Sequence, residues 1–336
     1  MKIAARMEQL PPYLFLELDR IIQQKQAQGH DVINLGIGDP DLPTPAHIVE
    51  ALQAAAARPA NHRYPNYLGS PAFREAIARW YHTRFGVSID PQTESVGLIG
   101  SKEGIAHLTW AMAGPNDVVL IPEPSYPVYF TQALLSGAEV YSLPLTPDNH
   151  FLPDLSAVPQ SVLSRAKMLW LNYPNNPTGA VAPREFLQDA VAFCRTHDIL
   201  LCSDLAYAEV GFDGYRAPST LEIDGAKDVC VEFYSLSKPF NMTGWRVAAA
   251  VGNPLAVKAL GTLKSNLDSG VFTAVQEAAA IALEHDPMAF FASQNPIYQE
   301  RRDLVIRALH ESGIDIPAPL STFFIWFPAP GGLTPS

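Results

Sequence analysis

Cysteine, positive charge and long apolar runs are all scarce in this sequence of 336 residues. The three cysteines, Cys194, Cys202 and Cys230, are odd in number and lack metal-ligand spacing, which favours reduced core thiols and predicts no metal site. No run of about twenty apolar residues occurs, so we expect no membrane span. The N-terminal MKIAARMEQLPPYLF lacks the apolar centre of a signal peptide, and we therefore expect a cytoplasmic protein.

The deficit of positive charge limits the partners that the protein attracts. Lys and Arg number 23 against 34 Asp and Glu, which gives a net charge of −11 and a pI near 5.2. An acidic protein is not drawn to the phosphates of nucleic acids or of anionic membranes, so we expect neither as a partner. A local basic pocket for one small phosphate is still compatible with this charge.

Short apolar runs recur through the middle of the chain, each bounded by Gly, Pro, Asn or Asp. Runs of this length suit strands buried on both faces, as in a mostly parallel α/β sheet covered by helices on both sides. The stretch between the last two runs is too short for a crossover helix, so we expect one antiparallel strand. The seven predicted strands are 95–100, 117–122, 138–143, 167–172, 199–204, 230–235 and 247–252.

Helical patterns fill the stretches between and around these runs. The predicted helices are 14–28, 43–57, 101–113, 126–136, 183–197, 254–265, 273–285 and 293–312. We expect the last helix to start near Pro296, residues 31–42 to be extended, and 321–328 to form one more strand. These elements predict a large domain over 43–288 and a smaller α+β domain that combines 1–42 with 289–336.

Two loops at predicted strand ends carry polar groups at the edge where such sheets bind ligands. The loop Gly100-Ser101-Lys102 opens a helix, whose first backbone N–H groups and dipole favour a phosphate. A plain serine cap beside a solvated lysine is the simpler interpretation of that loop taken alone. The loop NYPNNPTG at 172–179 contains more asparagine than a turn requires.

Two further loops carry groups that can be activated by burial. Asp204 directly follows the run ILLC, where a buried carboxylate needs a positive partner, although capping of the next helix would explain it equally well. Tyr207 follows three residues later and can face the same space. Lys238 ends another strand, where desolvation activates an amine, and Arg246 offers a bidentate cation for phosphate. Together these groups meet the demands of pyridoxal phosphate chemistry.

The motifs YPNYLGSPAFREAIA, NYPNNPTG, SDLAY and SLSKPFNMTGWR make the chain resemble the fold-type I pyridoxal phosphate enzymes, specifically the class I/II aminotransferases, from about residue 8 to 328. The resemblance implies that Lys238 forms the Schiff base with the cofactor and then moves a proton. It implies that Asp204 pairs with the ring nitrogen and that Tyr207 and Asn176 bind the ring O3′. Tyr126 would stack on the ring, and the phosphate would lie among Ser101, Lys102, Ser235, Ser237 and Arg246.

The resemblance also reaches beyond the cofactor. Tyr64 matches a tyrosine that reaches the phosphate of a neighbouring subunit, which implies a homodimer, and Tyr13, Gly38 and Asn176 match positions that touch the substrate. The segments GIGDPDLPTP, NMTGWR and KSNLDSGVF resemble in sequence those of the LL-diaminopimelate aminotransferase group. This implies an amino-acid donor, LL-diaminopimelate, a 2-oxo-acid acceptor, 2-oxoglutarate, and a role in lysine biosynthesis.

Three alternatives stay open at this point: an aspartate- or alanine-type aminotransferase, a pyridoxal-phosphate-dependent C–S lyase, and an inactive or regulatory module of the same fold. Family members usually continue beyond the FFIWFP segment with an arginine that binds the substrate α-carboxylate. Arg301, Arg302 and Arg307 lie too early in the chain to match it. We therefore expect a small domain that is incomplete at its C-terminus, and a chain that binds the cofactor but turns over substrate poorly.

Overall fold

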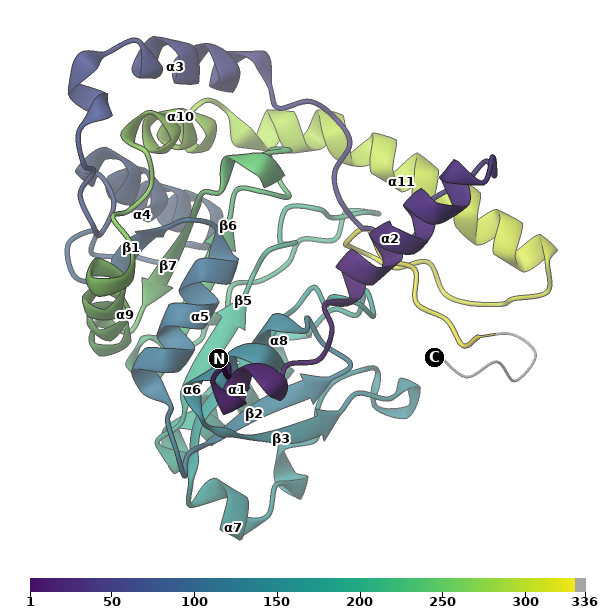
Figure 1. Cartoon of the computed structure of the whole chain (residues 1–336), viewed down its shortest axis with the longest axis horizontal. Helices are drawn as coiled ribbons and strands as arrows, with labels where there is room; N and C mark the ends of the chain where they lie inside the picture. Colours follow the sequence, from purple (N-terminus) through teal and green to yellow (C-terminus); the bar gives the residue numbers. More distant parts are fainter. Residues whose placement is uncertain (330–336) are drawn as a thin grey trace.

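A computed structural model describes residues 1–329, and their strands form one central sheet with helices around it (Figure 1). The strand order is β1-β7-β6-β5-β4-β2-β3, and β7 runs antiparallel to both of its neighbours while the remaining pairs are parallel. All seven predicted strands and the antiparallel member are thus confirmed. The strands are β1 (Ser95–Leu98), β2 (Val118–Glu123), β3 (Glu139–Pro144), β4 (Ala166–Leu171), β5 (Leu200–Asp204), β6 (Cys230–Ser235) and β7 (Ala248–Gly252).

Both faces of the sheet are covered because successive strand residues point to opposite sides and both sets are apolar. In β4, Leu169 and Leu171 pack into one core, whereas Met168 and Trp170 pack into the other. The first face carries α4 (Pro71–Phe85) and α8 (Arg184–His197), and α10 (Thr273–Glu284) packs against both α4 and α3 (Ala46–Ala56). The second face carries α5 (Ser101–Met112), α6 (Val128–Ser136) and α9 (Pro254–Leu267).

The remaining helices belong to the ends and connections of the chain. They are α1 (Ala5–Glu8), α2 (Leu14–Ala27), the short α7 (Gln160–Leu163) and the long α11 (Pro287–Glu311). Figure 1 shows α11 extending away from the sheet. No helix within residues 1–329 is long and apolar enough to cross a membrane. The predicted division into parts 43–288 and 1–42 with 289–336 stays a prediction, and residues 330–336 lie outside the described residues.

Two of the helices differ from the prediction. The helix α4 was not predicted. Its buried Phe73, Ile77 and Tyr81 recur at helical spacing, but the charged Arg74 is buried beside them and obscures the apolar pattern. The predicted start near Pro296 is wrong, because α11 begins at Pro287, where the Asp286 side chain accepts a hydrogen bond from the Ala289 N–H. Pro296 lies inside this helix.

The predicted strand over 321–328 is also wrong. Only Ser321 forms an isolated bridge, to Gly211, supported by hydrogen bonds from Phe212 N to Leu320 O and from Thr322 N to Val210 O. Beyond that bridge the chain is irregular, and the Phe324 ring packs edge-on against Tyr207. Phe323 likewise packs against Tyr207 and Tyr298, so this apolar run contributes aromatic contacts beside the sheet instead of a further strand.

Candidate active site

One cavity of about 350 Å³ collects every predicted site residue except Tyr64. It lies where β4, β5 and β6 end and α5 begins; β7 runs the other way, so Arg246, just before its start, reaches the same edge. Tyr64 instead lies 84% exposed beside a separate surface hollow that His62 and Phe272 also line. The cavity residues that were predicted are Tyr13, Gly38, Ser101, Lys102, Tyr126, Asn176, Asp204, Tyr207, Ser235, Ser237, Lys238 and Arg246.

Asp204 is a buried carboxylate with one oxygen in use. The Tyr129 hydroxyl donates to Oδ2 at 2.7 Å, whereas Oδ1 is buried and has no hydrogen-bond partner within the described part of the chain. Burial raises the pKa of Asp204 to about 6, and the hydrogen bonds from Tyr129 and from the Ala206 backbone lower it in part. A carboxylate in this state is stabilised by a cation or a charged ring nitrogen at Oδ1.

Aromatic rings form the wall beside this carboxylate. Tyr129 stacks on Trp170 with centroids 4.8 Å apart and 11° between planes, and Tyr126 meets Tyr129 edge-on at 5.8 Å. On the other side, Tyr207 packs edge-on against Phe324 at 5.4 Å. Burial raises the pKa of the Tyr126 and Tyr207 phenols, so both stay neutral and present hydroxyl donors to the cavity.

Lys238 is held by a segment that precedes it by two hundred residues. Its Nζ donates to Asp39 Oδ1 at 2.7 Å and to the Gly38 carbonyl at 3.5 Å. The Thr243 hydroxyl donates to the second oxygen of Asp39 at 3.3 Å, so the carboxylate bridges two residues of the Lys238 loop. The extended passage around Gly38 is thereby fixed over the cavity.

The start of α5 and the guanidinium of Arg246 form a cradle for an anion. Gly100 has a φ of +74°, and a Cβ at this position would overlap the Arg246 side chain. Arg246 itself has a φ of +53° and donates from Nη1 to the Thr243 carbonyl at 2.9 Å. The Ser101 hydroxyl is buried without a hydrogen-bond partner among residues 1–329, and Ser235 and Ser237 are buried beside the cavity. Helix N–H groups, hydroxyls and a guanidinium are the groups that bind phosphate.

The asparagine loop is fastened directly to the Asp204 strand. The Asn172 amide donates to the Asp204 carbonyl at 2.8 Å, and its Oδ1 accepts from the backbone N–H of Asn176 at 2.8 Å. Asn175 in turn accepts from the backbone and hydroxyl of Thr178. Asn172 and Asn175 therefore set the loop, which leaves the Asn176 side chain facing the cavity.

The sequence analysis missed four residues that shape the cavity. Asp39, Tyr129 and Thr243 line it and bind predicted residues, and Phe324 packs where a Cβ on Gly38 would overlap its ring. Asp39 lies in the motif GIGDPDLPTP and Thr243 in NMTGWR, whereas Tyr129 follows the predicted Tyr126 by three residues. Those motifs were the available signal, but only the contacts across the fold single out these members.

Arg301 and Arg302 are absent from the cavity lining. Arg301 pairs with Asp41 at 2.7 Å, whereas Arg302 is buried and pairs with Asp213 and Asp303, both at 2.6 Å. Their guanidiniums are thus engaged elsewhere, in agreement with the expectation that neither binds the substrate carboxylate.

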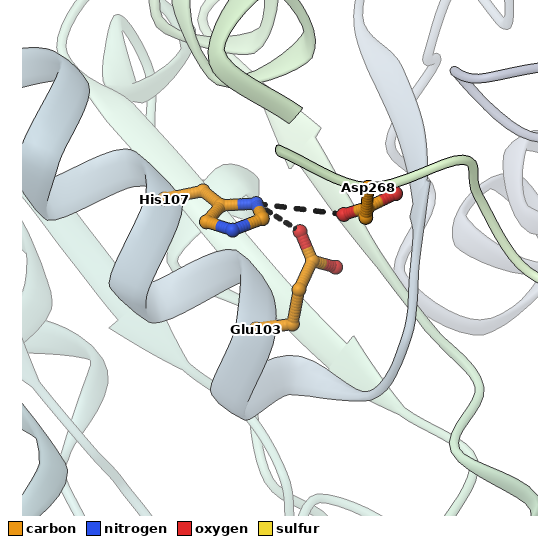
Figure 2. A group of neighbouring side chains, drawn as sticks. All are labelled: Glu103, His107 and Asp268. Carbon is orange, nitrogen blue, oxygen red and sulfur yellow. Dashed lines mark ion pairs between the residues drawn. The ribbon is translucent and has the colours of Figure 1, made fainter. Parts of the chain in front are cut away.

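A second cluster of titratable groups lies between α5 and the end of α9, and Figure 2 shows it. His107 Nδ1 is paired with Glu103 and lies 3.8 Å from Asp268 Oδ2, so three potential metal ligands converge. The fully buried Lys264 ammonium, however, already lies 2.9 Å from Asp268 Oδ1 and 3.3 Å from Glu103 Oε2. A cation therefore occupies the centre of the acidic pair, and we interpret the cluster as an ionic link between two helices.

The groups in the first cavity fit pyridoxal phosphate. The free Asp204 Oδ1 suits a protonated ring nitrogen, the free Ser101 hydroxyl and the Arg246 guanidinium suit a phosphate, and Lys238 supplies an amine. The cavity volume also lies within the usual range for small-molecule sites.

Comparison with known proteins agrees with this chemistry. The sequence model of the family described as Aminotransferase class I and II matches residues 30–330. The chain is 55% identical over 329 residues to the LL-diaminopimelate aminotransferase of Desulforudis audaxviator, covering 98% of this chain and 84% of the relative. The same enzyme of Dehalococcoides mccartyi strain 195 is 52% identical over 335 residues, covering 99% and 86%.

The fold is likewise shared with a solved structure. The substrate-bound BacF structure from Bacillus subtilis superposes with a TM-score of 0.95 at 39% sequence identity, covering 99% of this chain and 85% of that chain. The described sheet and cavity thus lie in the part of the fold that the two proteins have in common.

Proposed function

This chain belongs to the class I and II aminotransferases, and from that premise we propose that it transfers an amino group from LL-diaminopimelate to 2-oxoglutarate with pyridoxal phosphate as cofactor. The transfer would serve lysine biosynthesis. The observation that carries the substrate is the identity of 50–55% with LL-diaminopimelate aminotransferases over nearly the whole chain. The observation that supports the cofactor is the convergence of Lys238, Asp204 and the anion cradle on one cavity.

Each part of the cavity has a separate task in this proposal. Pyridoxal phosphate, when bound, supplies an aldehyde for the amino group and a ring that withdraws electrons. Asp204 Oδ1 would accept a hydrogen bond from the protonated ring nitrogen and so favour its charged form. The phenol of Tyr207 and the amide of Asn176 hold the ring hydroxyl, and Tyr126 limits the tilt of the ring. The phosphate binds at Ser101, Lys102, Ser235, Ser237 and Arg246.

Lys238 has the central task. With the cofactor bound, Lys238 would supply the amine that holds its aldehyde, and the same amine would be the base for the proton of the substrate α-carbon. Gly38 and Tyr13, at the mouth of the cavity, are the proposed substrate contacts. Because Gly38 has no side chain, the Phe324 ring packs directly against its backbone and closes the cavity beside this proposed contact.

We extend the proposal to a homodimer. Tyr64 is 84% exposed and lies outside the cavity of its own chain, in agreement with a role at a neighbouring subunit's phosphate. Sedimentation or light scattering should give twice the chain mass. Sharing of Tyr64 between subunits is tested with mixed dimers of Tyr64→Phe and the inactive Lys238→Ala. If each site uses the tyrosine of the other subunit, a mixed dimer contains one intact site and is more active than either variant alone.

The cofactor assignment is tested by the visible absorbance of the purified protein. Wild-type protein should bind pyridoxal phosphate and show a band near about 420 nm, as expected for a cofactor bonded to a lysine. Lys238→Ala should lack this band, whereas the control Lys258→Ala, a change on the exposed face of α9, should keep it. Identical spectra for wild type and Lys238→Ala would remove Lys238 from its role.

The substrate assignment is tested by single half-reactions. Loss of the visible band is measured after adding LL-diaminopimelate, glutamate, aspartate or alanine without an acceptor. LL-diaminopimelate and glutamate should both bleach the band, and 2-oxoglutarate should restore it. Bleaching by aspartate or alanine in place of LL-diaminopimelate would point to another aminotransferase, and steady release of pyruvate and ammonia from cystathionine would point to a C–S lyase.

A further inference from the structure

We propose that Tyr129 is a positioning residue for Asp204: its hydroxyl holds Oδ2, so that Oδ1 faces the place of the cofactor ring nitrogen. This inference rests on the proposed function, which gives Asp204 its partner. It adds a residue that acts through another side chain, since Tyr129 reaches the cavity next to Asp204 and binds that carboxylate directly.

The hydrogen bond from Tyr129 gives the two oxygens of the Asp204 carboxylate different roles. The Tyr129 hydroxyl lies 2.7 Å from Oδ2, within the usual range for a strong bond to a charged oxygen. Tyr129 and Asp204 are only 1% and 5% exposed, so water does not compete for this bond. Oδ1 has no protein partner among residues 1–329. A rotation of the carboxylate would break the only side-chain hydrogen bond that it accepts.

The Tyr129 ring is itself fixed in one orientation. It lies nearly parallel to Trp170 at 4.8 Å and edge-on to Tyr126 at 5.8 Å. Trp170 belongs to β4 and pairs in register with Cys202 of β5, two residues before Asp204. The donor Tyr129 lies on α6, and its ring rests on Trp170 of β4, the strand next to the β5 strand that carries Asp204. Packing of α6 on the sheet therefore sets the distance between the hydroxyl and the carboxylate.

The charge of Asp204 depends on few neighbours. The titratable side chains that act on it or feel its charge are the phenols Tyr126, Tyr129 and Tyr207, and burial raises the pKa of all three, which keeps them neutral. The other charged groups that line the cavity are Asp39, Lys102, Lys238 and Arg246. Because a neutral phenol donates a hydrogen bond at every working pH, the orientation of the Asp204 carboxylate does not change with pH until Asp204 itself gains a proton.

Removing the hydroxyl should therefore shift the titration of Asp204. Burial raises the pKa of Asp204, and the hydrogen bonds from Tyr129 and from the Ala206 backbone lower it. In Tyr129→Phe, only the bond from the Ala206 backbone still opposes the effect of burial. A hydrogen bond to a charged group is worth about tenfold or more in an equilibrium constant. We expect the pKa of Asp204 to rise by about one unit in Tyr129→Phe. Because the ionised carboxylate is the form that binds the ring nitrogen, the affinity for pyridoxal phosphate should fall about tenfold near about pH 5 and only about twofold at about pH 7.

Tyr81→Phe is a matched control on α4, which covers the opposite face of the sheet from Tyr129. The Tyr81 hydroxyl also donates to a fully buried carboxylate, Glu232 Oε1, at 2.9 Å, and neither residue lines the cavity. Ser203, Ser219 and the Thr220 backbone also bind that carboxylate. Tyr81→Phe should lower the free energy of unfolding without moving the titration of Asp204 or the cofactor affinity.

The experiment has two readouts. Asp204 is titrated in protein stripped of cofactor by NMR of ¹³C-labelled aspartate carboxyls, with Asp204→Asn to assign the signal. Cofactor affinity is then measured from pH 5 to 9, about the range in which the two states differ. A rise in the Asp204 titration and a loss of affinity of about tenfold near about pH 5 in Tyr129→Phe, both absent in Tyr81→Phe, support the proposal.

Two results overturn it. If Tyr129→Phe leaves the Asp204 titration unchanged, the hydroxyl has no hold on the carboxylate. If Tyr129→Phe and Tyr81→Phe lose cofactor affinity equally, the effect is one of general stability. Failure of the proposed function looks different: wild-type protein then binds no pyridoxal phosphate at any pH, while the NMR titrations still report on Tyr129.

Discussion

At the scale of single residues, the burial of Asp204 has a cost that only a bound partner offsets. The carboxylate lies at the end of β5 with one unused oxygen, and the sheet around it is apolar. Burial raises its pKa from 3.8 to about 6, which means that the folded chain holds a proton there more tightly than the unfolded chain does. The stability from that proton is present below about pH 4 and is lost as the pH rises through about 6.

Asp204→Asn should therefore stabilise the protein stripped of cofactor. We expect the free energy of unfolding to rise by about 2–3 kcal/mol at about pH 8 and to stay unchanged below about pH 4, because the amide carries no charge at either pH. Urea denaturation at both pH values measures this. The control Asp198→Asn replaces an exposed residue whose left-handed backbone asparagine also tolerates, and it should show no pH-dependent gain. A gain at low pH would contradict the argument.

At the scale of elements, the anion cradle depends on one glycine before α5. Gly100 has a φ of +74°, and a Cβ there would overlap the Arg246 guanidinium. We expect Gly100→Ala to displace Arg246 and to weaken pyridoxal phosphate binding at least about tenfold, the effect of losing one charged hydrogen bond. Absorbance titration with the cofactor measures the change. Gly114→Ala, where no atom lies within 4 Å of the added carbon, is the control and should bind normally.

The ionic link between α5 and α9 is another property of elements. Lys264 is fully buried between Glu103 and Asp268, and its removal would leave buried carboxylates without a cation. Lys264→Met should lower the free energy of unfolding by about 3–5 kcal/mol, as for a buried pair that has lost one partner. Arg165→Met, which breaks an exposed pair with Glu139, should cost at most about 1 kcal/mol. Equal losses in chemical denaturation would show that burial of the link is unimportant.

The elements also mark the limit of what the sequence predicts. Apolar runs bounded by turn residues locate all seven strands, because strands buried on both faces leave that pattern. The apolar pattern of the helix α4 is obscured, since the helix buries Arg74 as well as aromatic side chains. FFIWF was mistaken for a strand because a short apolar run looks alike in a strand and in a half-buried irregular segment.

The candidate site also has residues that the sequence predicts and residues that it does not. Lys238, Asp204 and Arg246 follow strands and belong to recognisable motifs, so the sequence alone suggests them. The partners that aim these side chains, Asp39 and Tyr129, are fixed by contacts between segments far apart in the chain. Local patterns contain no information about such contacts.

At the scale of the whole molecule, the cavity joins distant parts of one chain. Tyr13 and Gly38 come from its start, Asp204 and Lys238 from its middle, and Phe324 from its end. A ligand that binds all of them stabilises the folded state by about 2.7 kcal/mol at a concentration one hundred times its dissociation constant. For a chain of 336 residues, pyridoxal phosphate at that concentration should therefore raise the melting temperature by about 4 °C.

Unphosphorylated pyridoxal is the matched control for this measurement. It keeps the aldehyde and the ring but has no group for Ser101 and Arg246, so its effect on the melting temperature should be much smaller at equal concentration. Differential scanning calorimetry compares the two ligands. Equal shifts would mean that the cradle before α5 contributes nothing to binding.

The ion pair between Lys238 and Asp39 has a consequence for chemical protection. A nitrogen that carries a proton and points it at a carboxylate offers no lone pair, so stray aldehydes and reducing sugars find no nucleophile there. A carbonyl compound that reaches this nitrogen must first displace the contacts that Asp39 and the Gly38 carbonyl make with it.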